Sequence, residues 1–89
     1  MSVTETRIRF NEDASVLAEA DVTLDYSVVI RGFSIRRNAK GCLYVNFPQY
    51  KNSDGRMSDI VYSACPIVRS LITNFIIKDF ERLLETVKV

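Results

Sequence analysis

Residues 15–25 have the sequence SVLAEADVTLD, the clearest two-residue alternation in this chain of 89 residues. On an extended strand, one side would carry Val16, Ala18, Ala20, Val22 and Leu24, and the other side Glu19, Asp21, Thr23 and Asp25. The small alanines indicate that a bulky element, such as a helix, packs closely against the apolar side. The stretch therefore predicts one strand of a sheet that has a buried face.

The segments before and after this stretch also have strand character. Residues 3–10, VTETRIRF, predict a strand with Ile8 and Phe10 inward, and NEDAS at 11–15 predicts a polar turn. Residues 28–37, VVIRGFSIRR, predict a third strand. Its inward side would carry Val29, Phe33 and Ile35, with Arg31 in the same parity, while Val28 and Ile30 would point to the other side. Gly32 in its middle indicates a β-bulge or a close neighbour.

The second half of the chain predicts a hairpin and a helix. NAKG at 38–41 leads into a fourth strand at 42–47, which Pro48 ends or confines to an edge. NSDGR at 52–56 contains an Asp-Gly pair that suits a tight reversal, so a short fifth strand at 57–61 would close a hairpin.

A helix is expected over about 66–86, with Pro66 in its first turn, where the missing N–H costs nothing. Apolar residues recur there at helical spacing. They are Val68, Leu71, Ile72, Phe75, Ile76, Phe80, Leu83 and Leu84.

Together these elements predict a single α+β domain over residues 1–89. It would be an antiparallel sheet of four to five strands with one C-terminal helix packed on it. One helix covers only part of one face, so other apolar residues would need further cover, namely Leu17, Val28, Ile30 and Tyr44. A second copy of the chain is the simplest cover, and we expect a homodimer.

The composition excludes several classes of function. The chain has no histidine, which removes the usual general base and the commonest metal ligand. Three glycines at 32, 41 and 55 match no phosphate-binding loop. We therefore expect no enzyme, no cofactor, no metal and no small-molecule substrate. No signal peptide or membrane span is evident, so we expect a cytoplasmic protein with reduced cysteines and no membrane partner.

Charge is distributed unevenly along the chain. The formal net charge is +1, but residues 1–30 carry −4 and residues 31–69 carry +5. A basic middle is typical of a surface that binds a polyanion. The alternative is a set of solvated charges scattered over the sheet.

The order of features from Phe47 to the helix is specific. FP is followed by QYK, NSDGR and SDI, and an arginine follows ten residues after Asp59. This order resembles the stage V sporulation protein G (SpoVG) family of septation regulators. The matching positions are Pro48, Lys51, Asp54, Gly55, Asp59, Ile60 and Arg69. VTETRIRF and VTLDYSVVI also resemble that family, so the resemblance extends from Val3 to about Leu83.

The resemblance implies a small cytoplasmic homodimer that binds DNA, and RNA in some cases, and regulates gene expression. Lys51 and Arg56 would flank the turn, Arg69 would add a charge near the helix start, and Tyr50 could stack on an unpaired base. Arg31 and Lys40, together with Arg36 and Arg37, would extend the footprint.

Other interpretations stay open at this point. Tyr50 could pack on the sheet instead, and Arg56 could pair with Asp54 or Asp59. The rival function is a protein-interaction module in cell division that does not bind nucleic acid directly.

The chain also departs from the family's pattern in two places. Gln49, Tyr50 and a single Lys51 stand where the family has a serine and two bases, and Tyr62 and Ser63 replace its His-Pro pair. Both departures touch the expected binding region, so they bear on affinity.

Overall fold

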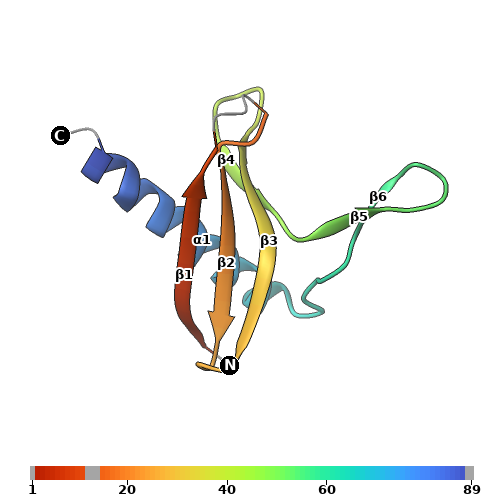
Figure 1. Ribbon diagram of the computed structural model, residues 1–89, viewed down its shortest axis with the longest axis horizontal. Helices are drawn as coiled ribbons and strands as arrows, with labels where there is room; N and C mark the ends of the chain where they lie inside the picture. Colours follow the sequence, from red (N-terminus) through yellow and green to blue (C-terminus); the bar gives the residue numbers. More distant parts are fainter. Residues whose placement is uncertain (1, 12–14, 88–89) are drawn as a thin grey trace.

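The computed structural model describes residues 2–11 and 15–87 and has the expected α+β architecture (Figure 1). Its elements are β1 (Val3–Phe10), β2 (Ala18–Leu24), β3 (Val28–Arg37), β4 (Leu43–Asn46), β5 (Gln49–Lys51), β6 (Met57–Asp59) and α1 (Pro66–Val87). Strands β1 to β4 form an antiparallel sheet in chain order, and β5 pairs with β6 in a separate two-stranded sheet. The predicted turn at 11–15 falls largely on residues 12–14, which lie outside the described residues.

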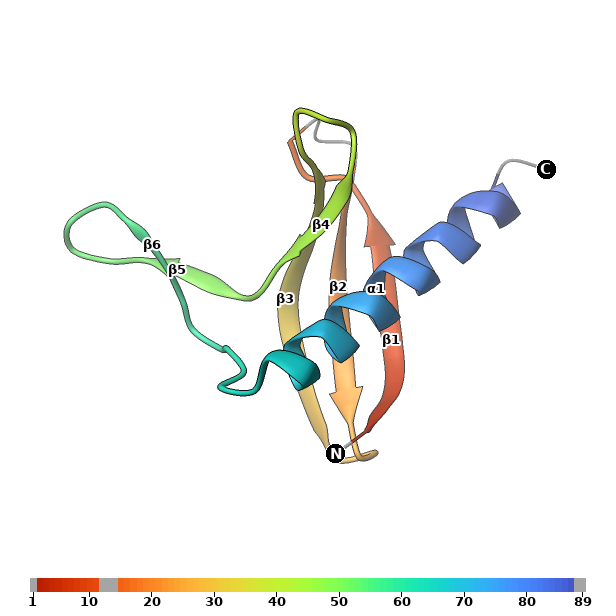
Figure 2. The same cartoon turned by 180° about the vertical axis from the view of Figure 1, so that it is seen from behind.

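Helix α1 crosses one face of the four-stranded sheet obliquely, and the core lies between them (Figure 2). Ala18 and Ala20 of β2 are fully buried, because their small side chains let the helix approach the sheet. The remaining core residues come from β2, β3, β4, the segment after it and α1: Val22, Phe33, Ile35, Val45, Phe47, Ile72, Ile76 and Phe80. The bulky element that the alanines predicted is therefore α1. No helix of the described residues is long and apolar enough to span a membrane.

A β-bulge at Gly32 corrects the predicted facing of β3. Ala20 lies opposite Phe33, but Asp21 lies opposite Arg31, so Gly32 is the extra residue. It has a φ of 98°, and an added Cβ there would lie 3.6 Å from Cβ of Pro48. The sequence prediction of a bulge or a close neighbour is thus correct on both counts.

The extra residue reverses the alternation in the first part of β3. Ile30 pairs with Val22 and Val28 with Leu24, so they share the helix-covered face. Val29 and Arg31 lie on the opposite face, and the prediction that Val29 points inward is wrong. Leu17 and Ile30 pack against the core, so they do not need the additional cover that the sequence suggested.

The hairpin that joins β2 to β3 turns on two residues with left-handed backbone. Asp25 and Tyr26 have φ of 50° and 54°, and the Ser27 N–H donates to Leu24 O at 2.9 Å. This is the geometry of a type I′ turn, whose twist matches that of the flanking strands. Strand β2 begins at Ala18, three residues later than the alternation suggested.

Strands β5 and β6 form an arm, defined here as residues 49–59, that projects sideways from the body (Figures 1 and 2). The predicted hairpin is present, but its second strand ends at Asp59 and does not join the main sheet. Its partner β5 follows directly after Pro48 and was not predicted as a separate strand. With the arm, the Cα radius of gyration is 13.5 Å, against about 12 Å for a compact domain of this length.

Candidate nucleic-acid interface

The tip of the arm is a loop that Asn52 holds closed. Asn52 Oδ1 accepts the backbone N–H groups of both Asp54 and Arg56 at 3.0 Å, and the Asn52 N–H donates to Arg56 O at 2.8 Å. Gly55, with φ of 81°, donates its N–H to Asn52 O. The predicted reversal therefore forms, and its shape is fixed by side-chain and backbone hydrogen bonds.

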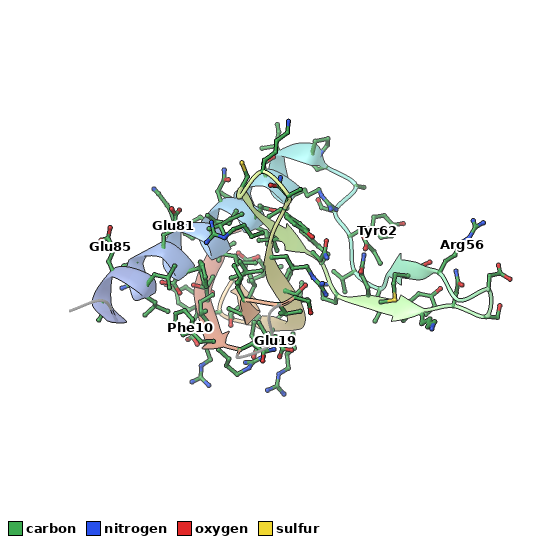
Figure 3. All side chains as sticks on the ribbon, turned by 90° about the horizontal axis from the view of Figure 1, so that it is seen from above. Phe10, Glu19, Arg56, Tyr62, Glu81 and Glu85 are labelled. Atoms are coloured by element: carbon green, nitrogen blue, oxygen red, sulfur yellow. The ribbon has the colours of Figure 1, made fainter. Side chains whose placement is uncertain are left out.

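Lys51 and Arg56 lie on either side of this loop, and both are exposed. Neither forms an ion pair with any residue in the described part of the chain, so the alternative pairing of Arg56 with Asp54 or Asp59 does not occur there. Figure 3 places Arg56 near the far end of the arm, away from the body. Lys51 and Arg56 are thus two cations without an ion-pair partner among the described residues, and they lie on either side of one ordered turn.

Tyr50 lies on β5 opposite Ser58, and half of its surface is exposed. Its ring therefore does not pack into the main sheet. A half-exposed ring on an extended ribbon is available for stacking on a base or for packing against a protein.

Arg69 lies at the base of the arm and not at its tip. Its guanidinium lies 4.5 Å from the ring centroid of buried Phe47, and its Nη1 lies 4.0 Å from Asp59 Oδ2. Asp59 in turn accepts a 2.8 Å hydrogen bond from Gln49 Nε2. Arg69 thus connects α1 to the segment that enters the arm, at Phe47, and to the strand that leaves it, at Asp59. Gln49, one of the departures from the family pattern, takes part in the same cluster.

The remaining candidates lie elsewhere on the chain. Arg31 is on the sheet face opposite α1, with its Nε 3.4 Å from Asp21 Oδ2. Lys40 is in the β3–β4 turn, where its N–H donates to Asn38 Oδ1, and this turn is at the end of β4 away from the arm. Within one chain the structure brings Lys51 and Arg56 together, sets Arg69 at the arm base and separates Arg31 and Lys40 from all three.

Sequence reasoning missed a charged cluster on the open face of the sheet. Asp21 is only 7% exposed and forms a two-point ion pair with Arg9 at 2.8 and 3.0 Å. The hydrogen bond from Arg9 lowers the pKa of Asp21 below its ordinary value, and the charges of Arg9 and Arg31 lower that pKa further. The signal was present in the alternation, because Arg7, Arg9, Glu19 and Asp21 share one side of their strands.

The described residues contain no group of three or more His, Cys, Asp or Glu residues placed to hold a metal ion. The first turn of α1 contains no acidic residue, and the carboxylate nearest to Arg69 is that of Asp59 from β6. At the arm tip, Lys51 and Arg56 lie on either side of a loop that also carries Asp54.

The fold and this projecting, cation-tipped arm define a small α+β protein with a β-ribbon appendage. The SpoVG family model matches residues 1–82, and the chain belongs to the SpoVG family. "Putative septation protein SpoVG" of Bacillus subtilis is 30% identical over 97% of this chain and 89% of its own length. The Myxococcus xanthus protein of the same name is 30% identical over 92% of this chain and 82% of its own length. These relatives are named for septation and not for an enzyme activity.

Proposed function

We propose that this chain is a nucleic-acid-binding regulator of the SpoVG type, which acts on gene expression and septation as a homodimer. It binds DNA, and RNA as a second ligand, through the tip of the arm. The observation that supports this most is the pair of unpaired cations, Lys51 and Arg56, on a loop whose shape Asn52 fixes. Since the loop is already ordered, a phosphate that binds there costs little additional loop entropy.

Two copies are needed because one arm offers few contacts. Lys51 and Arg56 can neutralise about two phosphates, which is too few for tight binding at physiological salt. A dimer doubles the number. Arg69 contributes indirectly, since it ties α1 to Phe47 and Asp59 and so sets the direction of the arm.

The test is binding to random duplex DNA and to single-stranded RNA over a series of salt concentrations. The double variant Lys51→Ala, Arg56→Ala should bind more weakly, and its log–log salt slope on duplex DNA should fall by about 0.9 for each lost contact. The matched control is Lys78→Ala, Arg82→Ala, which also removes two cations but from α1. Equal binding by the arm-tip variant and the control would place the site elsewhere.

The rival function, a protein-interaction module, is favoured by one observation. The arm has no net charge, because Lys51 and Arg56 are balanced by Asp54 and Asp59, and it exposes apolar side chains such as Met57. A protein partner that stays bound after nuclease treatment, together with no nucleic-acid binding at low salt, would favour this function.

A further inference from the structure

Strand β1 forms a free edge of the four-stranded sheet. Among residues 2–11 and 15–87, its only strand partner is β2. β1 is eight residues long, whereas β4, the strand at the other edge, has four. Proteins ordinarily pair or cover a long edge, because its unpaired N–H and C=O groups attract another strand. The edge of β1 is therefore a place at which a further strand can add.

The pairing with β2 determines which backbone groups of β1 point outward. The Asn11 N–H, directly after β1, donates to Leu17 O at 3.0 Å. In an antiparallel ladder, residue pairs that share hydrogen bonds alternate with pairs that share none, and the register contains no shift after Glu5. Thr6 and Ile8 therefore direct their N–H and C=O groups away from β2.

The C-terminal half of α1 extends past this edge and forms the second wall of a groove (Figures 1 and 2). The groove has a volume of about 580 Å³ and lies between the start of β1 and the α1 residues Phe75, Lys78, Asp79 and Arg82. Thr6 Oγ1 donates to Asp79 Oδ2 at 2.8 Å and so joins the two walls. An extended segment paired with β1 would lie beside α1, with every second side chain directed to the helix.

The helix wall of the groove has an apolar part and a cationic part. Phe75 is an aromatic residue that is 44% exposed, so an apolar side chain that covered it would be stabilised by the hydrophobic effect. Lys78 is exposed and has no ion-pair partner among the described residues. Asp79 is already neutralised by an ion pair with Arg82. The uncompensated charge of Lys78 is therefore complementary to one carboxylate.

The distance between these two parts matches the repeat of a strand. The midpoint between Lys78 and Arg82 lies about 7 Å beyond Phe75 along the helix axis. Side chains on the same side of a strand, two residues apart, are separated by about 7 Å. A segment with an apolar residue and an acidic residue two positions apart would therefore reach both parts at once.

We propose that this groove binds an extended segment of a partner protein, which adds to β1 as a further strand and places an apolar and an acidic side chain against Phe75 and Lys78. The occupant is a protein because another backbone supplies N–H and C=O groups at the spacing of those on β1. Nucleic acid is disfavoured there, since Glu5 and Asp79 line the groove and would repel phosphates.

The groove gives the molecule a second binding surface, away from the arm. The arm leaves the body on the β4 side of the sheet, whereas the groove lies along β1 at the opposite edge (Figure 1). A partner protein in the groove therefore leaves the arm tip accessible. The inference does not rest on the proposed function, and it is tested without nucleic acid.

The first experiment selects binders from a library of random decapeptides displayed on phage, against the nuclease-treated full chain. The enriched peptides should share an apolar and an acidic residue two positions apart within a segment rich in β-branched residues. If no peptide is enriched, or if the enriched peptides lack this pattern, the proposal is wrong.

The second experiment measures the affinity of the most enriched peptide, made synthetically with a fluorescent label, by anisotropy. Lys78→Glu should raise its dissociation constant at least about tenfold. The same peptide with lysine in place of its acidic residue should bind Lys78→Glu better than it binds the native chain, which also shows that the variant is folded. The matched control is Lys40→Glu, which reverses one exposed cation in the β3–β4 turn and should bind like the native chain. Equal affinities for Lys78→Glu and Lys40→Glu would overturn the proposal.

Amide hydrogen exchange distinguishes strand addition from a contact with side chains of α1 alone. The peptide should slow exchange at Thr6 and Ile8, whose N–H groups point outward, and leave Arg7 and Arg9 unchanged because these already bond to β2. Unchanged exchange at Thr6 and Ile8 would contradict strand addition. Slow exchange at both amides without peptide, lost on dilution, would place a second copy of the chain in the groove and would also overturn the proposal.

The two proposals of this protein's function fail separately. Peptide binding that depends on Lys78, in a chain that binds no nucleic acid, would support the groove and contradict the role of the arm tip. Nucleic-acid binding that depends on Lys51 and Arg56, in a chain that selects no peptide, would give the converse result.

Discussion

At the scale of single residues, two positions are unusual: Tyr26 has an unfavourable backbone conformation, and Asp21 is a charged residue that is buried. Tyr26 adopts a left-handed backbone although it has a Cβ, and it is 88% exposed. Asp21 is buried although it is charged, and its negative charge is neutralised by ion pairs with Arg9 and Arg31. Each exception has a local physical reason, and each gives a direct prediction.

Tyr26→Gly should stabilise the protein. A left-handed L-residue costs about 1–2 kcal/mol, and glycine loses about 0.5–1 kcal/mol more backbone entropy on folding. Because the exposed ring makes few contacts, the free energy of unfolding should rise by about 0.5 kcal/mol. Urea denaturation measures this, with Tyr26→Ala as the control that removes the ring and keeps the strain. An equal effect of both substitutions would contradict the argument from backbone strain.

Stability should decrease in acid partly through Asp21. Its pKa is lower in the folded than in the unfolded state, so its contribution is fully present above the ordinary value of 3.8. That contribution is lost as the pH falls below 3.8 toward the folded-state pKa. The pKa of Asp25 is also lowered, by a hydrogen bond from the Ser2 N–H, so part of the acid dependence would remain without Asp21.

Asp21→Asn isolates this contribution. It should lower the free energy of unfolding at pH 7 by about 1 kcal/mol and reduce its slope between pH 5 and 2. The effect is modest because the side chains of Arg9 and Arg31 are already 47% and 78% exposed, so both cations can be solvated by water when the ion pair is lost. Urea denaturation over a pH series provides both values. If Asp21→Asn left the pH dependence of the free energy of unfolding unchanged, the ion pair between Asp21 and Arg9 would not stabilise the protein in solution.

At the scale of elements, the alternation within strands predicted most of the sheet, but it could not locate interruptions of the alternation. β1 and β3 have the expected bounds, and α1 contains the expected apolar stripe, of which Leu71 and Phe75 are exposed. The facing of Val28 and Val29 was predicted wrongly, because the bulge at Gly32 moves every earlier side chain of β3 to the other face. A glycine indicates that a bulge is possible, but only the pairing with β2 fixes where it lies.

For the candidate site too, the sequence predicted the local structure of the arm but not its position in the molecule. Its turn was predictable from Asn52–Arg56, because Asp-Gly pairs have strong local preferences. Its position was not, because local turn preferences do not determine where the chain leaves the four-stranded sheet, and Pro48, at that point, lies close to Gly32 of a different strand. The sequence therefore grouped Lys51, Arg56 and Arg69, and the structure divides them between tip and base.

Gly32→Ala should destabilise the protein by about 1–2 kcal/mol. The φ of 98° is unfavourable for alanine, and relief of that strain would shift the register between β2 and β3. Thermal unfolding measures the change, and Ser34→Ala in the same strand is the control. If Gly32→Ala were as stable as the native protein, the bulge would not be needed.

Arg69→Ala should loosen the arm without unfolding the body. The substitution removes the contact with the Phe47 ring, worth about 1 kcal/mol, and the ion pair with Asp59. Amide hydrogen exchange should become faster in β5, in β6 and at Ile60, whose N–H donates to Pro48 O. Exchange in β2 should stay unchanged. Faster exchange throughout the sheet would instead identify Arg69 as a residue needed for the whole fold.

At the scale of the whole molecule, one helix on one sheet makes a small core, and the arm contributes little to it. The arm is a separate two-stranded sheet that pairs over only three residues in each strand. In the proposed homodimer, Lys51 and Arg56 would be presented twice, at two arm tips. Arg31 and Lys40 lie away from those tips, so they are expected to add little to nucleic-acid affinity.

The most direct measurement is the salt dependence of binding to random duplex DNA by the native chain and by Lys51→Ala, Arg56→Ala. We predict a steep decrease in the native affinity with salt, and a slope for the variant that is smaller by about 0.9 per lost contact. The control Lys78→Ala, Arg82→Ala should keep the native slope. If the native chain bound no nucleic acid at low salt, or if the arm-tip variant kept the full slope, the proposed role of the arm would be wrong.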